Sequence, residues 1–202
     1  MLLANNLKVK RAEKIIFKNI NISTAPGKIT FIKGNNGSGK TTLLKTLVNI
    51  LKPEKGEIFW MGKKLNKNIY DFFNSVTLIL DKPTSSLELT VLENIIFWKN
   101  ISSSKLAFKE ITTLLKILKM DQYLNTKTMY LSKGEIKKLE LTRLILEQKK
   151  LWILDEPYNG LDNESIDIIN ETFIDHVSNK GMIVFASHYE PDLKNLEILV
   201  LT

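Results

Sequence analysis

A glycine-rich segment followed by a lysine and a threonine constrains the fold of this chain more than any other feature of its sequence. Gly34 and Gly39 are separated by four residues, and Lys40 and Thr41 follow directly. The apolar run Thr30 to Ile32 precedes the segment, and leucines at helical spacing follow it. A strand, a glycine-rich turn and a helix in this order are typical of a phosphate-binding loop.

This arrangement suits a phosphate group, because glycines allow successive backbone N–H groups to turn inward on its oxygens. The N-terminus of the following helix adds about half a positive charge. Lys40 is expected to reach the β- and γ-phosphates of a nucleotide, and the Thr41 hydroxyl to ligate Mg²⁺. The residues of the loop expected to bind ATP are Gly34, Asn35, Asn36, Gly37, Ser38, Gly39, Lys40, Thr41 and Thr42.

The composition indicates one compact globular domain, because 202 residues with 44% hydrophobic and 25% charged side chains can bury a core. Apolar runs such as Val76 to Leu80 are far shorter than the roughly 18 residues of a membrane span, so the chain is not expected to form a pore. The first residues are interpreted as a strand rather than a signal peptide. The sequence has no cysteine, which excludes disulfides and thiolate metal sites.

The formal net charge of +7 is compatible with a polyanionic partner, such as nucleic acid or an anionic membrane surface. However, the lysines occur in scattered pairs rather than in one basic motif with interleaved aromatic residues. We therefore interpret the charge as a solvated basic surface and expect no nucleic-acid partner.

The period of the apolar residues changes along the chain and predicts the fold. Residues 2–33 contain short β-rich runs, the phosphate loop opens a helix expected to reach Pro53, and residues from about 88 to 148 have mostly helical spacing. The almost wholly apolar runs Leu151 to Leu154 and Met182 to Ala186 are typical of parallel strands buried on both faces. The predicted fold is α/β, a P-loop NTPase (RecA-like) three-layer core with an N-terminal antiparallel β-subdomain and an inserted helical subdomain.

Two acidic residues, Asp155 and Glu156, follow the apolar run Trp152 to Leu154. Ligands of open α/β sheets bind at the carboxyl ends of the strands. Asp155 is therefore predicted to hold Mg²⁺, directly or through water, and Glu156 to polarise the attacking water as a general base. Carboxylates commonly cap strands and helices, but the position of this pair downstream of a phosphate loop supports the catalytic interpretation.

The segment Leu131 to Glu135 has the pattern of a helix N-cap at Ser132. It also resembles the signature sequence of ABC ATPases, which in that family contacts the γ-phosphate of ATP bound to the partner subunit. The resemblance implies this role for Ser132, Lys133, Gly134 and Glu135. Lys133 replaces the second small residue of the family pattern and Glu135 replaces its glutamine, but the helix N-terminus remains suited to an anion.

Two later segments resemble the same family. The segment Asn159 to Asp162 is similar to the loop through which the two subunits of an ABC dimer communicate, which implies this role for Asp162. His188 follows the apolar run ending at Ala186 and resembles the switch histidine that contacts the γ-phosphate and the attacking water. His176 is interpreted as an ordinary surface or core residue. The resemblance covers essentially the whole chain and implies a single nucleotide-binding domain over residues 1–202, with its helical subdomain at about 88–148.

Two positions depart from the family pattern. The glutamine that usually touches Mg²⁺ would lie near Asp81 and Lys82, where the sequence has none. Lys82, or Asp81 through water, could substitute for it, but neither is assigned as a ligand. The usual aromatic platform for adenine is also missing, and Arg11 is predicted to stack on the base by cation–π attraction. The alternative is that Arg11 is a solvated loop residue.

Among ABC ATPases, the chain most resembles the ATP-binding subunits of the haem exporter of cytochrome c maturation. The minimal length and four segments carry this resemblance, namely Leu7 to Phe17, Gly56 to Trp60, Glu88 to Asn94 and Leu151 to Pro157. In that family ATP hydrolysis supports the delivery of haem through a membrane-bound chaperone. Nothing in the sequence itself indicates a pair of haem ligands.

This resemblance implies an ATPase that forms a head-to-tail homodimer with ATP and associates with integral membrane permease subunits. It implies a peripheral position on the cytoplasmic face of the inner membrane, or on the matrix face if an organelle encodes the chain. Three alternatives stay open: the ATPase subunit of another ABC exporter, a soluble ABC ATPase outside transport, and a nucleotide-binding module without turnover.

Overall fold

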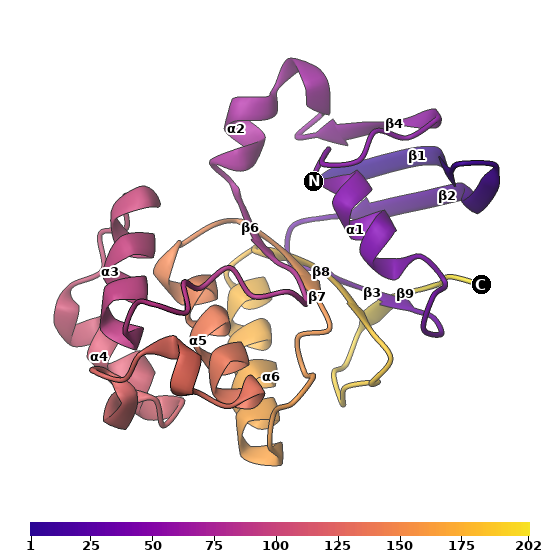
Figure 1. Ribbon diagram of the computed structural model, residues 1–202. Coiled ribbons are helices and arrows are strands. Elements are labelled where there is room, and N and C mark those ends of the chain that lie inside the picture. The colour runs from indigo at the N-terminus through magenta and orange to yellow at the C-terminus, as the bar shows by residue number, and fades with distance from the viewer.

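Two β-sheets organise residues 1–202, all of which the computed structural model describes (Figure 1). The antiparallel sheet has the order β2-β1-β4-β5, with β1 at Leu2–Arg11, β2 at Lys14–Thr24, β4 at Lys55–Trp60 and β5 at Lys63–Lys64. The second sheet has the order β6-β7-β8-β3-β9, and every neighbouring pair in it is parallel. Its strands are β3 (Ile29–Lys33), β6 (Val76–Ile79), β7 (Leu151–Asp155), β8 (Met182–Ser187) and β9 (Leu196–Val200).

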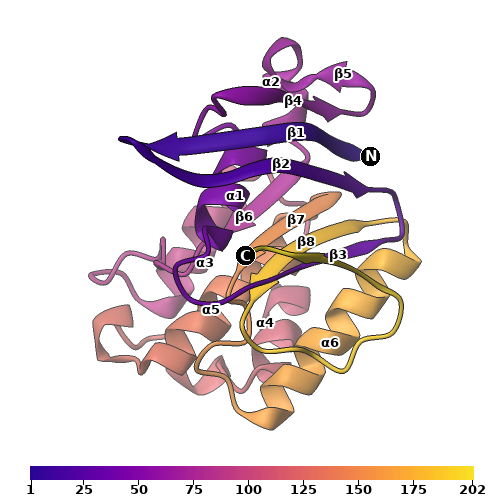
Figure 2. The same cartoon turned by 90° about the vertical axis from the view of Figure 1, so that its right-hand side faces the viewer.

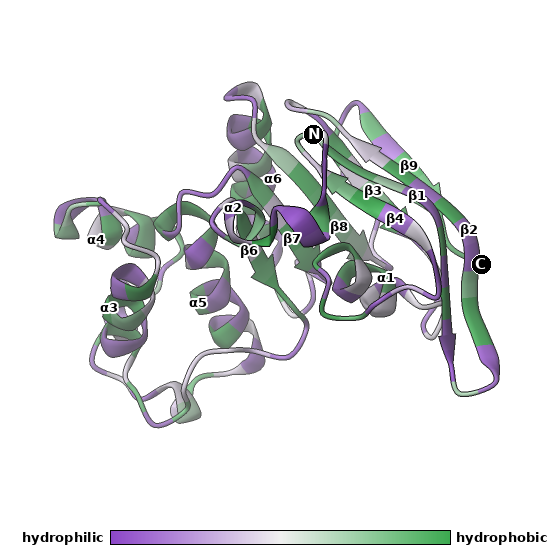
Figure 3. Cartoon of the chain, turned by 90° about the horizontal axis from the view of Figure 1, so that it is seen from above, coloured by the Kyte–Doolittle hydropathy of each residue, from purple (hydrophilic) through white to green (hydrophobic).

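The helices complete the layers. Helix α1 (Lys40–Leu47) lies between the two sheets, and α6 (Asn163–Ser178) covers the opposite face of the parallel sheet (Figure 2). Helices α3 (Val91–Ile101), α4 (Phe108–Ile117) and α5 (Lys133–Leu146) gather to one side of the sheets (Figure 3). The remaining short elements are α2 (Ile69–Phe73), η1 (Leu65–Lys67), η2 (Asp121–Tyr123) and η3 (Thr128–Tyr130). The predicted three-layer α/β fold with an antiparallel sheet and a helical insertion is confirmed.

Strand β7 is apolar from Leu151 to Leu154 because the sheet is covered on both faces there. Leu151 and Ile153 belong to the core formed with α1 and the antiparallel sheet, whereas Trp152 and Leu154 belong to the core formed with α6. Every residue of β7 is therefore buried, as expected for a parallel strand covered on both faces. A third core joins α3, α4 and α5. None of the helices combines the length and the apolar character needed to cross a membrane.

Helix α1 is shorter than the sequence pattern predicted. It ends at Leu47 rather than near Pro53, because Asn49 adopts a left-handed conformation with φ of 59°. The N–H groups of Ile50 and Leu51 then donate to the carbonyl oxygen of Lys45 at 2.9 and 3.1 Å. These bonds satisfy the end of the helix, as asparagine in this conformation commonly does.

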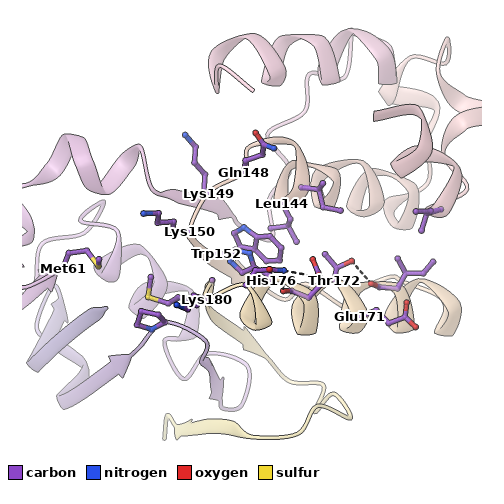
Figure 4. A pocket seen from close by; sticks show the side chains of 18 residues that line it. Met61, Leu144, Gln148, Lys149, Lys150, Trp152, Glu171, Thr172, His176 and Lys180 are labelled. Carbon is purple, nitrogen blue, oxygen red and sulfur yellow. Dashed lines mark hydrogen bonds between the residues drawn. The ribbon is translucent and has the colours of Figure 1, made fainter. Parts of the chain in front are cut away.

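His176 is half-buried and packs away from the nucleotide site. Its ring stacks on the indole of Trp152, with centroids 3.6 Å apart and planes 8° apart. Figure 4 shows both rings in the wall of an open pocket of about 800 Å³. This pocket lies at the amino ends of β7 and β8, away from the carboxyl edge that carries Asp155. A side chain at Gly181 would overlap the His176 ring, so the glycine leaves the space that the stack occupies.

Burial lowers the pKa of His176, against the opposing effect of hydrogen bonds with the backbone of Lys150 and Met182. The unfolded chain therefore binds more protons than the folded chain as pH falls below about 6.5, the ordinary histidine value, and stability falls with it. We expect the melting temperature of the wild type to drop more between about pH 7.5 and 5.5 than that of His176→Phe, which keeps a stacking ring without the titration. Parallel melting curves over this range would contradict the assignment.

Candidate nucleotide-binding site

The glycine-rich loop joins β3 to α1 at the carboxyl edge of the parallel sheet, as its sequence predicted. Gly39 has a φ of 98°, which side chains other than glycine rarely tolerate. A Cβ on Gly39 would lie 2.6 Å from the Ile16 side chain, and a Cβ on Gly34 would lie 2.6 Å from the Leu201 carbonyl oxygen. Strand β2 and the last residues of the chain therefore require glycine at both positions.

The backbone of the loop presents unused hydrogen-bond donors. The N–H of Ser38 donates to the carbonyl oxygen of Asn35 at 3.1 Å, whereas the other N–H groups of the loop, including those of Gly37, Gly39, Lys40 and Thr41, donate to no protein atom. Gly37 and Thr41 are exposed. Free N–H groups at a helix N-terminus form a site for anions such as phosphate.

The Lys40 side chain is folded back along the loop. Its Nζ donates to the carbonyl oxygens of Gly34 at 2.8 Å and Asn35 at 3.3 Å. The same Nζ lies 3.5 Å from Oε1 of Glu156. Because Lys40 is only 6% exposed, these oxygens fix the ammonium group between the loop and the end of β7.

Thr41 and Asp155 meet at the edge of the loop. The Thr41 hydroxyl donates to Oδ2 of Asp155 at 2.6 Å, and Asp155 is only 1% exposed. Burial raises the pKa of Asp155, while the hydrogen bond from Thr41 lowers it and the charge of Glu156 raises it further. Mg²⁺ is usually bound by one or two protein carboxylates together with substrate phosphates and water, so this pair of oxygen donors fits it. No cluster of three or more His, Cys, Asp or Glu residues is arranged to hold a metal.

Glu156 is held by three donors from the end of β8. Its Oε2 accepts from the Ser187 hydroxyl at 3.1 Å and from the His188 backbone N–H at 3.2 Å, and Nδ1 of His188 lies 2.8 Å from it. Glu156 also has a φ of 47°, a conformation that is uncommon outside glycine and concentrates at functional sites. The structure therefore brings the predicted residues Lys40, Glu156 and His188 together.

Ser187 was given no role by sequence reasoning. The signal for it is weak but present, since it is the one polar residue of β8 and is buried at the end of an otherwise apolar strand. Its hydroxyl also accepts from the Tyr189 N–H at 2.9 Å. Ser187 thus fixes both the Glu156 side chain and the turn that carries His188.

The N-terminus of α5 carries the predicted cap. The Ser132 hydroxyl accepts from the Glu135 N–H at 3.3 Å, and Oε2 of Glu135 accepts from the Ser132 N–H at 2.7 Å, which is a capping box. A hydrogen bond from Tyr123 lowers the pKa of Glu135 most, and burial opposes it. Ser132 and Lys133 are exposed, and no hydrogen bond or ion pair joins the cap to the phosphate loop of the same chain.

Asp162 links the N-terminal part of α5 to the start of α6. It accepts from the Ser165 N–H at 2.8 Å and from Nζ of Lys138 at 2.8 Å. The bond with Lys138, followed by those with Ser165, holds the pKa of Asp162 well below its usual range. A Cβ on Gly134 would lie 2.5 Å from the carbonyl oxygen of Gly160, so the two segments touch through glycine.

Three residues noted in the sequence lie at the surface. Arg11 is exposed beside the turn between β1 and β2, and no hydrogen bond joins it to the phosphate loop. Asp81 and Lys82 are exposed after β6 and make no hydrogen bond or ion pair. The stacking of Arg11 on adenine stays a prediction.

Comparison with known proteins decides the family. The sequence model of the ABC transporter family matches residues 17–159, which is more than half of the chain. The chain belongs to the ABC transporter family. As predicted, this ABC-type chain is an ATP-binding ATPase, and its phosphate loop lies within the matched residues.

Curated relatives extend the match over the whole length. The chain is 34% identical to the cytochrome c biogenesis ATP-binding export protein CcmA of Rickettsia bellii, with 100% of both chains covered. It is 33% identical to the protein of the same name from Reclinomonas americana, covering 98% of this chain and 89% of the relative. An ABC transporter ATP-binding protein from Pyrococcus furiosus has the same fold, with a TM-score of 0.85 at 24% identity and coverage of 99% and 96%.

Proposed function

We propose that this ABC-type chain is the ATP-hydrolysing subunit of a membrane transporter complex that serves cytochrome c biogenesis, as part of the haem exporter or haem-chaperone release system. The observation that carries the proposal is the 34% identity over 100% of both chains with a relative named for this pathway. The alternative is the ATPase subunit of another ABC exporter, which would share the site; the ABC transporter ATP-binding protein from Pyrococcus furiosus matches over a similar length but at only 24% identity.

The residues of the site take the following proposed roles. The residues from Gly34 to Thr42 bind the phosphates of ATP, with Lys40 on the β- and γ-phosphates, and Thr41 and Asp155 hold Mg²⁺. When bound, the metal ion neutralises charge that develops on the phosphates. Glu156 accepts a proton from the attacking water, and His188 orients Glu156 and contacts the γ-phosphate. Arg11 stacks on the adenine.

The proposed active form is a head-to-tail homodimer with two ATP molecules. The exposed N-terminus of α5 supports it, since no hydrogen bond or ion pair joins Ser132 to its own phosphate loop. Ser132, Lys133, Gly134 and Glu135 would contact the ATP of the second copy, and Asp162 would communicate between the copies. Each copy would be one nucleotide-binding domain over residues 1–202, with a helical subdomain at about 88–148.

The proposed partners are integral membrane permease subunits, with the chain peripheral on the cytoplasmic face of the inner membrane, or on the matrix face in an organelle. Exposed apolar side chains on the helical part support this docking, because Phe97 and Ile101 are one helical turn apart on α3 and exposed apolar surface of this kind can mark a protein interface. Phe97 is 53% exposed, Ile101 is 65% exposed and Phe108 is 55% exposed. No nucleic-acid partner is proposed.

Purification from detergent-solubilised membranes tests the proposal. Tagged wild-type chain should retain an integral membrane protein, and the double variant Phe97→Asp/Ile101→Asp should lose most of it while still binding ATP. Ile174→Asp is the matched control, since Ile174 is 54% exposed on α6, away from α3. A chain that retains no membrane partner, and whose ATPase is stimulated by DNA in a salt-sensitive manner, would instead be a soluble switch.

A further inference from the structure

Lys137 is a buried ammonium group without a partner. It lies on the inward stripe of α5 together with Leu141 and Leu144, at the spacing of one helix face, and is only 7% exposed. Its Nζ makes no hydrogen bond, and no carboxylate oxygen lies within 4.0 Å of it. Buried lysines are almost always paired, because an isolated buried charge is strongly destabilising. Lys137 therefore requires an explanation beyond packing.

Carboxylates lie around Lys137 at longer range than an ion pair, on α5 itself, after β6 and at the end of β7. Four carboxylates attract its charge, with Asp81 the strongest of them, followed by Asp155, Glu140 and Glu156. Burial lowers the pKa of Lys137, and these carboxylates oppose that change. The ammonium is thus held by the combined field at the carboxyl edge of the sheet rather than by an ion pair.

Three of these carboxylates already have other donors. Asp155 accepts from Thr41 at 2.6 Å, and Glu156 accepts from Ser187 at 3.1 Å. Glu140 accepts from the N–H groups of the segment after Asp81, at 2.7 and 2.6 Å. Asp81 alone has no hydrogen bond or ion pair and is exposed. Lys137 is consequently placed to balance the charge of Asp81 and of the proposed metal ligand Asp155 without binding either.

We propose that Lys137 is a built-in cation of the nucleotide site, which offsets the charge of Asp155 and Asp81 when no metal is bound and opposes Mg²⁺ when it binds there. The inference rests on the proposed metal position at Thr41 and Asp155. Lys137 acts through these carboxylates, so it is a positioning residue rather than a catalytic one. Like charges in a partly buried site repel strongly, so the ammonium reduces the gain in nucleotide affinity that Mg²⁺ provides.

The measurement is the coupling between Mg²⁺ and ADP, defined as the ratio of ADP affinity with saturating Mg²⁺ to ADP affinity in EDTA. ADP is not hydrolysed, so the ratio does not depend on turnover. In Lys137→Met the uncompensated carboxylates repel the phosphates in EDTA and attract Mg²⁺ more strongly. We expect the coupling to rise at least about fivefold.

Two further variants show whether the coupling depends on the charge at position 137 or on the shape of the side chain. Lys137→Arg keeps the charge and should hold the coupling within about twofold of the wild type. Lys116→Met makes the same change in net charge at an exposed position on α4, where screening should leave the coupling unchanged. A merely structural role for Lys137 predicts weaker ADP binding in both conditions and an unchanged ratio, which would overturn the proposal.

If Lys137→Met fails to fold, the variant Asp81→Asn tests the same proposal. Asp81 is exposed, so this substitution should leave the fold intact. Removing this carboxylate leaves Lys137 less compensated, so the coupling should fall by at least about twofold. An unchanged coupling in Asp81→Asn would overturn the proposal. If the wild-type chain binds no ADP, the proposed function is overturned as well. If the wild type binds ADP more tightly with Mg²⁺ and Lys137→Met has the same coupling, this inference alone is overturned.

Discussion

Glu156→Gln is expected to bind ATP with an affinity within about threefold of the wild type and to hydrolyse it about 10²- to 10⁴-fold more slowly. The amide keeps the volume of the carboxylate, so the phosphate loop should be undisturbed. It cannot accept a proton from water, and it no longer offers a charged acceptor to Ser187 and His188, which lie 3.1 and 2.8 Å from Oε2 in the wild type. Phosphate release and equilibrium nucleotide binding measure the two effects separately.

The matched control is Glu171→Gln, which makes the same chemical change at an exposed position on α6. Its rate should equal that of the wild type. The Glu156→Gln protein should also accumulate as an ATP-bound dimer in size-exclusion chromatography. Undiminished hydrolysis would remove Glu156 from the role of general base.

Lys40→Met should weaken ATP binding at least about 100-fold, because charge-assisted contacts to phosphate are among the strongest polar interactions. Nζ of Lys40 also lies 3.5 Å from Oε1 of Glu156, so its loss leaves that carboxylate uncompensated beside the incoming phosphates. ATP affinity by fluorescence titration and melting temperature without nucleotide should be measured together. Lys45→Met, on the same helix, is the control and should bind ATP normally; equal affinities for the two variants would refute the role of Lys40.

The sequence was sufficient to predict the elements that meet at the carboxyl edge of the parallel sheet. Uninterrupted apolar runs identify β7 and β8, and strands of this kind must be parallel and covered on both faces. Residues directly after such strands converge at one edge, which is why Asp155 and Glu156 could be predicted from their positions. His188 was predicted from its position together with its resemblance to the switch histidine of the family.

The pairing register was not available from the sequence, and it determines the contacts of Glu156. Asp155 pairs with Ala186 across β7 and β8. This register places Ser187 and His188 beside Glu156, whereas a shift of one residue would turn the side chains to the opposite face. The donors to Glu156 therefore follow from the packing of two distant segments, which no local pattern reports.

Lys137 was missed for a different reason. It forms one of the scattered lysine pairs of the sequence, together with Lys138, and it falls in line with Leu141 and Leu144 on a face that proves to be buried. A charge in an apolar stripe is a local signal that could have been used. The short or partly exposed elements β4, β5, β9 and α2 lack such a signal, because their burial depends on neighbours far away in the chain.

The phosphate loop is closed by segments that lie more than 140 residues further along the chain. Its strand β3 hydrogen-bonds to β8 on one side and to β9 on the other, and the N–H of Leu201 donates to the carbonyl oxygen of Lys33 at 2.7 Å. During synthesis the glycine-rich segment emerges well before β8 and β9, the two neighbours of β3. A nascent chain therefore cannot assemble the nucleotide site cotranslationally from its first half, and ATP binding reports that translation has passed β9.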